Sequence, residues 1–229
     1  MKISVITICY NCEKTIRKTV ESVLNQTYKN YEYIIIDGSS QDESLKIISN
    51  FKSQITKIIS EKDNGIYDAI NKGISHSTGD AIVLLHGNDI LSQKEALSKI
   101  SYHFVKHQNV DVILSNVIFK KNFESKKSVR LYSSKFFKNW MLRIGYSPPH
   151  LASFFRSNAI KKVGKYNNDY KIAGDFDYFV RSFLNLNLKH KYIDENLIVM
   201  SLGGRSNRGI ASYIKSSFEI NNSLKKNGF

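Results

Sequence analysis

Four apolar stretches in the first half of the chain each end in polar, mostly acidic residues. Tyr10 and Asn11 follow the first stretch, residues 37–40 the second, residues 61–63 the third and residues 86–89 the fourth. Carboxylate, amide and hydroxyl groups can hydrogen-bond a ribose or the edge of a base, and carboxylates can hold a divalent metal beside a diphosphate. If these residues lie together, their chemistry suits a nucleoside diphosphate and its metal.

The pattern of the first half predicts that they do lie together. We predict strands over residues 2–8, 31–36, 55–59, 81–85 and 110–119. We predict intervening helices after a cap at Asn11, from a Ser40–Glu43 capping box through residue 51, over residues 65–75, and from a Ser92–Glu95 capping box. This alternation predicts a Rossmann-like, mostly parallel sheet, in which ligands bind beyond the carboxyl ends of the strands.

The second half is less regular and gives no clear domain boundary. Residues 120–143 carry eight Lys and Arg but only one acid, Glu124. We expect residues 153–155 to return to the sheet, followed by a helix over 175–186, a strand over 191–200 and a C-terminal helix over 210–226. We therefore expect a single domain over residues 1–229, with a ligand-binding half at 1–119 and a second half at 120–229.

The composition restricts the partners and the compartment. The formal net charge of +14 implies an anionic partner: nucleic acid, an acidic membrane surface or a phosphorylated substrate. We expect no nucleic acid, because the usual recognition signatures do not occur. We expect a cytoplasmic protein, since no apolar run approaches the ~18 residues of a membrane span and the N-terminus does not resemble a signal peptide. Cys9 and Cys12 are too few for a disulfide framework.

Several ordered motifs resemble family 2 glycosyltransferases, which are inverting enzymes of the GT-A fold. The motifs are residues 5–11, 22–28, 35–40, 65–73, 78–80 and 173–181. The resemblance is dense over residues 1–90 and thin over 148–206. It implies a sugar-nucleotide donor, a divalent metal (Mn²⁺ or Mg²⁺) and a glycan or polyprenyl-diphosphate-linked acceptor of the bacterial polysaccharide or O-antigen type.

The resemblance also implies roles for individual donor-binding residues. Thr7 and Tyr10 would line the nucleobase pocket, and Asp37 would accept a hydrogen bond from the base, usually uracil. Asp68 and Asn71 would contact the ribose or the diphosphate. Asn88 would belong to the same donor-binding group.

Asp175 would occupy the position of the catalytic base. An inverting transfer needs one carboxylate to take the proton of the acceptor hydroxyl while the diphosphate leaves from the opposite face. Asp177 is a rival, but residues two apart on a helix point about 200° away from each other, so both cannot face one acceptor. We expect Asp177 to make a structural bond.

The metal loop departs from the family pattern. Family members commonly end this loop in two adjacent aspartates, whereas residues 86–89 read His-Gly-Asn-Asp. Asp89 is the expected metal ligand. His86 either ligates the metal, which would favour Mn²⁺ over Mg²⁺, or simply ends the strand.

Two further positions have two interpretations each. His150 could bind the donor phosphate or help to hold the metal, or it could be a loop histidine satisfied by its neighbours. Residues 203–206 resemble a glycine-rich segment that closes over the diphosphate, with Arg205 suited to an anion. The alternative for this segment is a plain turn with a solvated arginine.

An apolar stripe within the basic segment bears on membrane contact. Phe136, Phe137, Trp140, Met141 and Ile144 recur at helical spacing among Lys135, Lys138 and Arg143. This pattern is typical of an amphipathic helix that lies peripherally in a membrane interface, here the inner face of the plasma membrane. The stripe could instead cover the core of the sheet, with the cations as ordinary solvated surface.

We therefore expect an inverting hexosyl- or N-acetylhexosaminyltransferase that uses a UDP-sugar in cell-surface polysaccharide synthesis. A relative that binds a nucleotide or a glycan without transfer is the first alternative, motivated by the altered loop at residues 86–89. A nucleotidyltransferase is the second, but residues 9–12 (Cys-Tyr-Asn-Cys) supply no glycine-rich basic loop for a triphosphate. A P-loop is excluded, because GxxxxGK[ST] does not occur.

Overall fold

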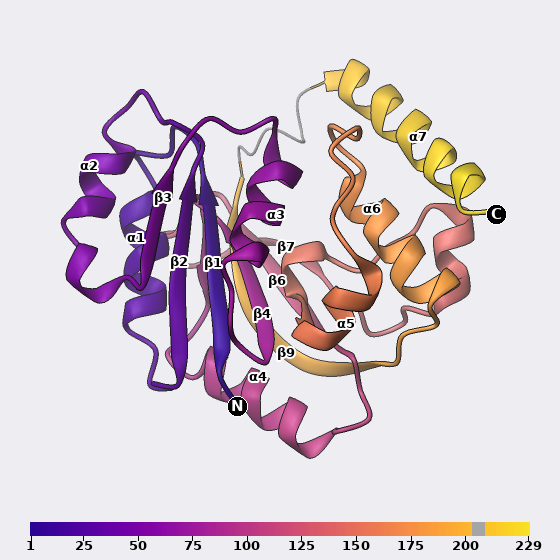
Figure 1. Ribbon diagram of the computed structural model, residues 1–229, viewed down its shortest axis with the longest axis horizontal. Coiled ribbons are helices and arrows are strands. Elements are labelled where there is room, and N and C mark those ends of the chain that lie inside the picture. Colours follow the sequence, from indigo (N-terminus) through magenta and orange to yellow (C-terminus); the bar gives the residue numbers. More distant parts are fainter. Residues whose placement is uncertain (203–208) are drawn as a thin grey trace.

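The computed structural model describes residues 1–202 and 209–229, and within them nine strands form one sheet (Figure 1). The spatial order is β3-β2-β1-β4-β8-β6-β9-β5, with β7 paired to β6. The strands are β1 (Ile3–Cys9), β2 (Tyr31–Asp37), β3 (Lys57–Ser60), β4 (Ala81–His86), β5 (Asp89–Leu91), β6 (Val112–Lys120), β7 (Ser128–Tyr132), β8 (Ser153–Arg156) and β9 (His190–Ser201).

The parallel part of the sheet brings the predicted polar residues to one edge. β1 is buried along its whole length and pairs in parallel with β2 on one side and β4 on the other. The register sets Asp37 beside Cys9 and Ser60 beside Asp37, and it sets His86 beside Ile8. The predicted Rossmann-like sheet is therefore confirmed, and the ends of four strands meet.

Helices cover both faces of this sheet. α1 (Ile16–Leu24), α2 (Ser44–Ser49) and α4 (Ala96–Lys106) enclose one apolar core, and α3 (Ile66–Ser75), α5 (Ser157–Val163) and α6 (Gly174–Phe179) enclose a second (Figure 1). α7 (Gly209–Lys226) packs beside α6. Short helical segments are η1 (Lys52–Gln54), η2 (Asn139–Ile144), η3 (His150–Ala152) and the π-helical η4 (Val180–Asn185). None of the described helices is long and apolar enough to cross a membrane.

The second half returns to the middle of the sheet. β8 lies between β4 and β6 and is antiparallel to both, so the predicted return of residues 153–155 is confirmed. β9 runs parallel to β6, and its end pairs with β5 directly after the metal loop. The two halves of the chain therefore share one sheet.

The predicted helix starts are wrong in three places, because each capping side chain bonds elsewhere. Asn11 accepts a hydrogen bond from the Gln41 backbone, and α1 begins at Ile16. The Ser40 hydroxyl donates to Asp37. The Ser92 hydroxyl donates to the Asn196 carbonyl. The helices that we expected to begin at the Ser40–Glu43 and Ser92–Glu95 capping boxes begin instead at Ser44 and Ala96.

The apolar stripe of residues 136–144 does not form one face of an α-helix. Residues 139–144 form a 3₁₀-helix, which has three residues per turn, and so the 3.6-residue spacing that we assumed does not hold. Phe137 packs into the second core, as does Leu142, which was not part of the stripe. Phe136, Trp140 and Ile144 are 74%, 55% and 71% exposed. The stripe thus both covers the core and presents aromatic surface to solvent.

Candidate active site

The carboxylate of Asp37 organises the loop after β2. It is fully buried and accepts hydrogen bonds from the backbone N–H and hydroxyl of Ser40 and from the hydroxyl of Ser60. A Cβ on Gly38 would lie 2.4 Å from a carboxylate oxygen of Asp63, so a larger residue there would displace the Asp63 side chain. Tyr10, predicted for the nucleobase pocket, is 41% exposed, and its ring lies 3.4 Å from where a Cβ on Gly38 would be. Tyr10 and Asp37 therefore belong to neighbouring loops, but the Asp37 carboxylate already has protein donors, so its predicted bond to a base is not supported.

Thr7 does not join them. Its side chain is fully buried, and its hydroxyl lies 3.0 Å from the hydroxyl of Tyr33, in the core beneath α1 and α2. Side chains alternate along a strand, and Thr7 points into this core instead of beyond the strand end. The prediction that Thr7 lines a nucleobase pocket is not supported.

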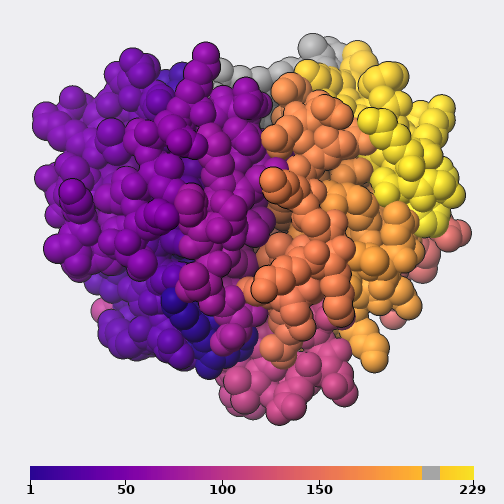
Figure 2. All heavy atoms as spheres, in the orientation of Figure 1, coloured from indigo at the N-terminus to yellow at the C-terminus, as the bar shows by residue number. Residues whose placement is uncertain are grey.

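The two polar residues predicted on α3 have different surroundings. Asp68, in the first turn, accepts the backbone N–H of Asn64, which together with Lys72 and Asn168 lowers the pKa of its carboxyl. It borders a small pocket of about 20 Å³ lined by residues 64–68, 168, 170 and 171. The purple and orange parts of the chain meet on the face of the molecule drawn in Figure 2.

The amide of Asn71 is instead occupied by the backbone of Tyr166. Its oxygen accepts the Tyr166 N–H at 2.8 Å, and its nitrogen donates to the Tyr166 carbonyl at 2.9 Å. Asn71 thus fastens α3 to the second half of the chain. The expected donor contact is not supported, because both polar atoms already have partners.

His86 and Asp89 form a buried pair at the end of β4. Nδ1 of His86 lies 3.4 Å from Oδ2 of Asp89. Among the described residues, three atoms of this pair are buried without a hydrogen-bond partner: both carboxyl oxygens of Asp89 and the Nε2 atom of His86. Burial raises the pKa of Asp89 to about 8 and, with the nearby His150, lowers the pKa of His86 to about 3.

Unpartnered buried polar atoms are costly, so this pair fits a bound cation. Within the described residues, no three His, Cys, Asp or Glu side chains lie close enough to hold a metal. The protein can therefore supply two ligands here, and a diphosphate and water would complete the shell. Asn88, between them, is half-buried, and its carbonyl accepts the hydroxyl of Ser201.

His150 is satisfied by its neighbours. Its Nε2 atom lies 2.9 Å from the hydroxyl of Tyr166, and its ring packs edge-on against Phe179. Burial lowers its pKa to about 4. Of the two interpretations of His150, the structure supports the loop histidine. Arg205 and the rest of the glycine-rich segment lie outside the described residues.

Asp175 lies in the first turn of α6, where its Oδ1 atom accepts the N–H of Phe176 at 2.8 Å. Burial raises the pKa of its carboxyl to about 6. Tyr67 lies beside it and donates its hydroxyl to the Ile172 carbonyl at 2.6 Å. This approach requires glycine next to Asp175, because a Cβ on Gly174 would lie 2.6 Å from the Tyr67 ring.

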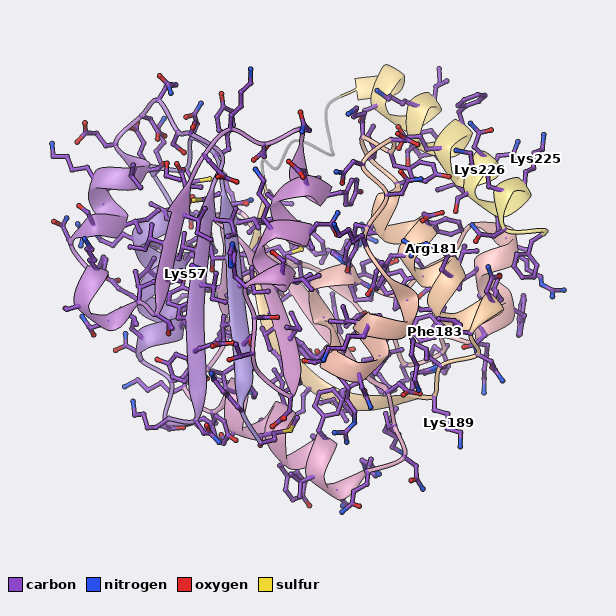
Figure 3. All side chains as sticks on the ribbon, in the orientation of Figure 1. Lys57, Arg181, Phe183, Lys189, Lys225 and Lys226 are labelled. Carbon is purple, nitrogen blue, oxygen red and sulfur yellow. The ribbon has the colours of Figure 1, made fainter. Side chains whose placement is uncertain are left out.

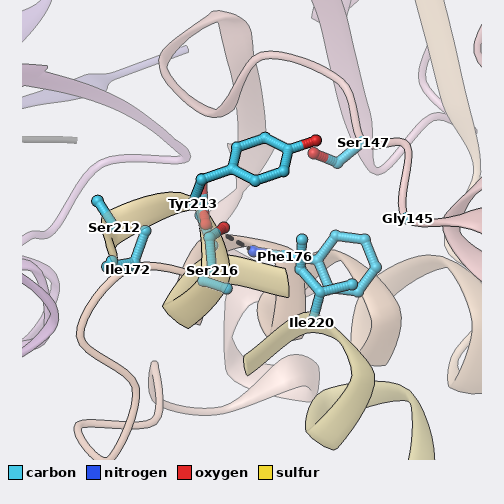
Figure 4. Close-up of a pocket in the computed structure, with 10 residues that line it drawn as sticks. Gly145, Ser147, Ile172, Phe176, Ser212, Tyr213, Ser216 and Ile220 are labelled. Carbon is cyan, nitrogen blue, oxygen red and sulfur yellow. Dashed lines mark hydrogen bonds between the residues drawn. The ribbon is translucent and has the colours of Figure 1, made fainter. Parts of the chain in front are cut away.

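A cavity of about 570 Å³ opens at Asp175 (Figure 4). Its walls come from the loop after η2, the backbone around α6 and one face of α7. The lining residues are Gly145, Ser147, Ile172, Ala173, Asp175, Phe176, Ser212, Tyr213, Ser216 and Ile220. Asp175, whose carboxyl has the raised pKa, therefore lines a space large enough for a small ligand.

Two acids clamp α7 beside this cavity. Asp177 pairs with Arg181, which is labelled in Figure 3, and accepts hydrogen bonds from Ser223 and Asn227. These contacts agree with the structural role that we expected for Asp177. Glu219, which the sequence analysis missed, is buried on α7.

The carboxylate of Glu219 accepts the backbone N–H groups of Lys171, Ile172 and Ala173, the segment that leads to Asp175. The only hint in the sequence was an acid beside Phe218 and Ile220 in a predicted helix. Such a hint does not reveal a partner 46 to 48 residues away.

The chain is similar to known proteins in both sequence and structure. The profile described as "Glycosyl transferase family 2" matches residues 4–164 of this chain. The chain belongs to this family. The PGL/p-HBAD biosynthesis glycosyltransferase of Mycobacterium tuberculosis is 28% identical over 211 residues, which cover 89% of this chain and 78% of that protein. An uncharacterized glycosyltransferase of the same species is 32% identical over 198 residues, covering 80% and 69%.

Solved structures of glycosyltransferases share the fold. TarS of S. aureus in complex with UDP superposes with a TM-score of 0.77 at 18% identity, covering all of this chain and 67% of that one. Glucosyl-3-phosphoglycerate synthase of Mycobacterium tuberculosis, in complex with Mn²⁺, UDP and phosphoglyceric acid, gives 0.70 at 14% identity, covering 100% and 79%. The predicted GT-A fold is confirmed.

The raised pKa of Asp175 predicts a pH-dependent stability. The folded state binds this proton more tightly than the unfolded chain does, so ionisation costs stability as pH rises from about 4 to about 6. We expect Asp175→Asn to be more stable than the wild type at pH 7, by on the order of 1–3 kcal/mol. The gain should vanish near pH 4 in urea titrations, and equal stabilities at pH 7 would contradict the burial argument.

Proposed function

We propose that this family member is an inverting enzyme that transfers a sugar from a UDP-sugar to a hydroxyl of a glycan or a polyprenyl-diphosphate-linked acceptor. The observation that carries the proposal is that Asp175 lines the 570 Å³ cavity and has a carboxyl pKa raised to about 6. A base of this pKa is ionised at neutral pH and is a better proton acceptor than an exposed aspartate. The proposed role is in cell-surface polysaccharide synthesis.

The donor would bind where the strands end. Asp37 fixes the loop beside Tyr10, and Asp68 borders the small pocket between the start of α3 and residues 168–171. UDP is the nucleotide named for several structural neighbours, including TarS with UDP-GlcNAc, while a mannosyltransferase neighbour carries GDP-Man and Mn²⁺. These neighbours support a nucleotide-sugar with a hexosyl or N-acetylhexosaminyl group.

His86 and Asp89 would hold a divalent cation beside the diphosphate. The unpartnered atoms of the pair support this assignment, and the imidazole favours Mn²⁺ over Mg²⁺. When bound, the cation supplies positive charge that stabilises the leaving diphosphate.

The transfer step then requires one proton acceptor from the protein. The acceptor oxygen attacks the anomeric carbon and forms a new glycosidic bond, while its proton passes to the Asp175 carboxylate. The bond from the anomeric carbon to the diphosphate breaks, and its electron pair leaves with the nucleoside diphosphate. Attack and departure on opposite faces invert the anomeric configuration.

Asp175→Asn tests the proposed function. We expect the transfer rate to fall at least about 100-fold, because the amide cannot take the proton, with UDP affinity unchanged within about twofold. In the wild type the rate should fall as pH drops through about 6, where Asp175 becomes protonated. Asp80→Asn is the control, because Asp80 is an exposed acid directly before β4, at the opposite end of that strand from His86. Full activity of Asp175→Asn would refute the base assignment.

Asp89→Ala tests the metal site by binding alone. Calorimetry of UDP with and without Mn²⁺ should show that the variant loses the metal-dependent part of its affinity, at least about tenfold. Asp89→Asn, which keeps the shape but removes the charge, should behave in the same way. If both variants bind UDP with unaltered metal dependence, the cation lies elsewhere.

The exposed aromatic residues near η2 support a peripheral membrane contact at the inner face of the plasma membrane. Phe136, Trp140 and Ile144 point to solvent among Lys135 and Arg143. Two more cations, Lys225 and Lys226, lie in the last turn of α7 (Figure 3). Apolar side chains flanked by cations bind anionic lipid surfaces.

Vesicle sedimentation tests this contact. We expect the triple change of Phe136, Trp140 and Ile144 to Ser to release the protein from anionic vesicles. Phe137 stays unchanged because it is part of the core. The matched control replaces Tyr102 and Val105, equally exposed on α4, with Ser and should leave binding intact. Equal sedimentation of the triple variant and the wild type would contradict the proposal.

A further inference from the structure

The residues that line the cavity at Asp175 differ from those proposed to bind the nucleotide. Among its ten lining residues in the described chain, none follows β1, β2, β3 or β4, where the nucleotide is proposed to bind. It is bounded instead by α7 and by residues 145–147. A base must contact the acceptor, so a second space beside Asp175 is where an acceptor group would lie.

The lining chemistry fits a neutral sugar. Ser147, Ser212, Tyr213 and Ser216 supply hydroxyl groups, while Ile172, Phe176 and Ile220 supply apolar surface. A pyranose has the same combination, with hydroxyls at its edges and C–H groups on its faces. No Lys or Arg occurs among these described lining residues, and Asp175 adds negative charge, so a phosphate is disfavoured in this space.

Tyr213 is the residue best placed to select that sugar. It lies at the cavity and is 78% exposed, and its hydroxyl points toward Ser147 across the space (Figure 4). Tyr213, Ser216 and Ile220 recur at i, i+3 and i+7, so they share the face of α7 that borders the cavity. An exposed aromatic ring beside hydroxyl donors can stack on an apolar sugar face.

The helix that carries Tyr213 is held in place relative to Asp175. Glu219, six residues later, accepts the N–H groups of residues 171–173, and Ser223 and Asn227 bond to Asp177. These contacts fix the walls of the cavity that α6 and α7 form before any ligand binds. A preformed wall reduces the entropy that binding would otherwise cost.

We propose that this cavity is the acceptor-sugar subsite and that Tyr213 determines its specificity, stacking on a neutral pyranose while the hydroxyls of Ser147 and Ser216 bond its edge. The proposal rests on the proposed function, in that the sugar hydroxyl nearest Asp175 is the one that would be glycosylated. A phosphate of a lipid-linked acceptor would lie outside this cavity.

The test measures binding without turnover. Saturation-transfer NMR in the presence of UDP would use methyl glucosides, galactosides, mannosides and N-acetylglucosaminides, with glucose 1-phosphate as the anionic probe. We expect at least one neutral glycoside to bind through its C–H face, at least fivefold more weakly to Tyr213→Ala and nearly normally to Tyr213→Phe. Tyr102→Ala, an exposed tyrosine on α4, should match the wild type.

Two outcomes would overturn the proposal: binding that is equal in Tyr213→Ala and the wild type, or no binding of any neutral glycoside. Preference for glucose 1-phosphate would also overturn it. Asp175→Asn separates this proposal from the proposed function, because it should abolish transfer yet keep glycoside binding. If Asp175→Asn transfers sugar normally while Tyr213→Ala still loses binding, the base assignment fails and the subsite stands.

Discussion

The buried carboxylate of Glu219 holds together the part of the molecule that faces the proposed acceptor. A buried carboxylate is costly unless donors surround it, and here the donors are three consecutive backbone N–H groups of residues 171–173. Because that segment leads directly into α6, the position of Asp175 and the position of α7 are set by the same contact. The cavity between them is therefore a property of one hydrogen-bonded unit.

The buried acids of this chain divide into two kinds. Asp37, Asp177 and Glu219 are satisfied by donors from the protein itself, and they stiffen the loops around them. Asp89 is as deeply buried, yet its oxygens have no partner among the described residues. Its raised pKa of about 8 means that this carboxyl holds a proton at neutral pH, and a bound cation would take the place of that proton. The metal site that we propose here would therefore have fewer protein ligands than a loop that ends in two aspartates.

Much of the fold could be predicted from the sequence, because strands buried on both faces read as continuous apolar runs. The polar residues after those runs, Asp37 and Asp89 among them, were found for the same reason. The errors concern side chains whose partners are distant in the sequence: Thr7 bonds Tyr33, Asn71 bonds Tyr166, and the Ser92 hydroxyl bonds Asn196. Local periodicity carries no information about such partners, and for the same reason it could not reveal Glu219 or the cavity.

The place of β8 in the sheet affects how the chain must fold during synthesis. Residues 153–156 lie between β4 and β6, both of which leave the ribosome earlier. Until β8 emerges, each of those strands has an open edge, and such edges are where nascent chains associate wrongly. The centre of the sheet can therefore close only after residues 153–156 have been made, and the other edge of β6 stays open until β9 follows.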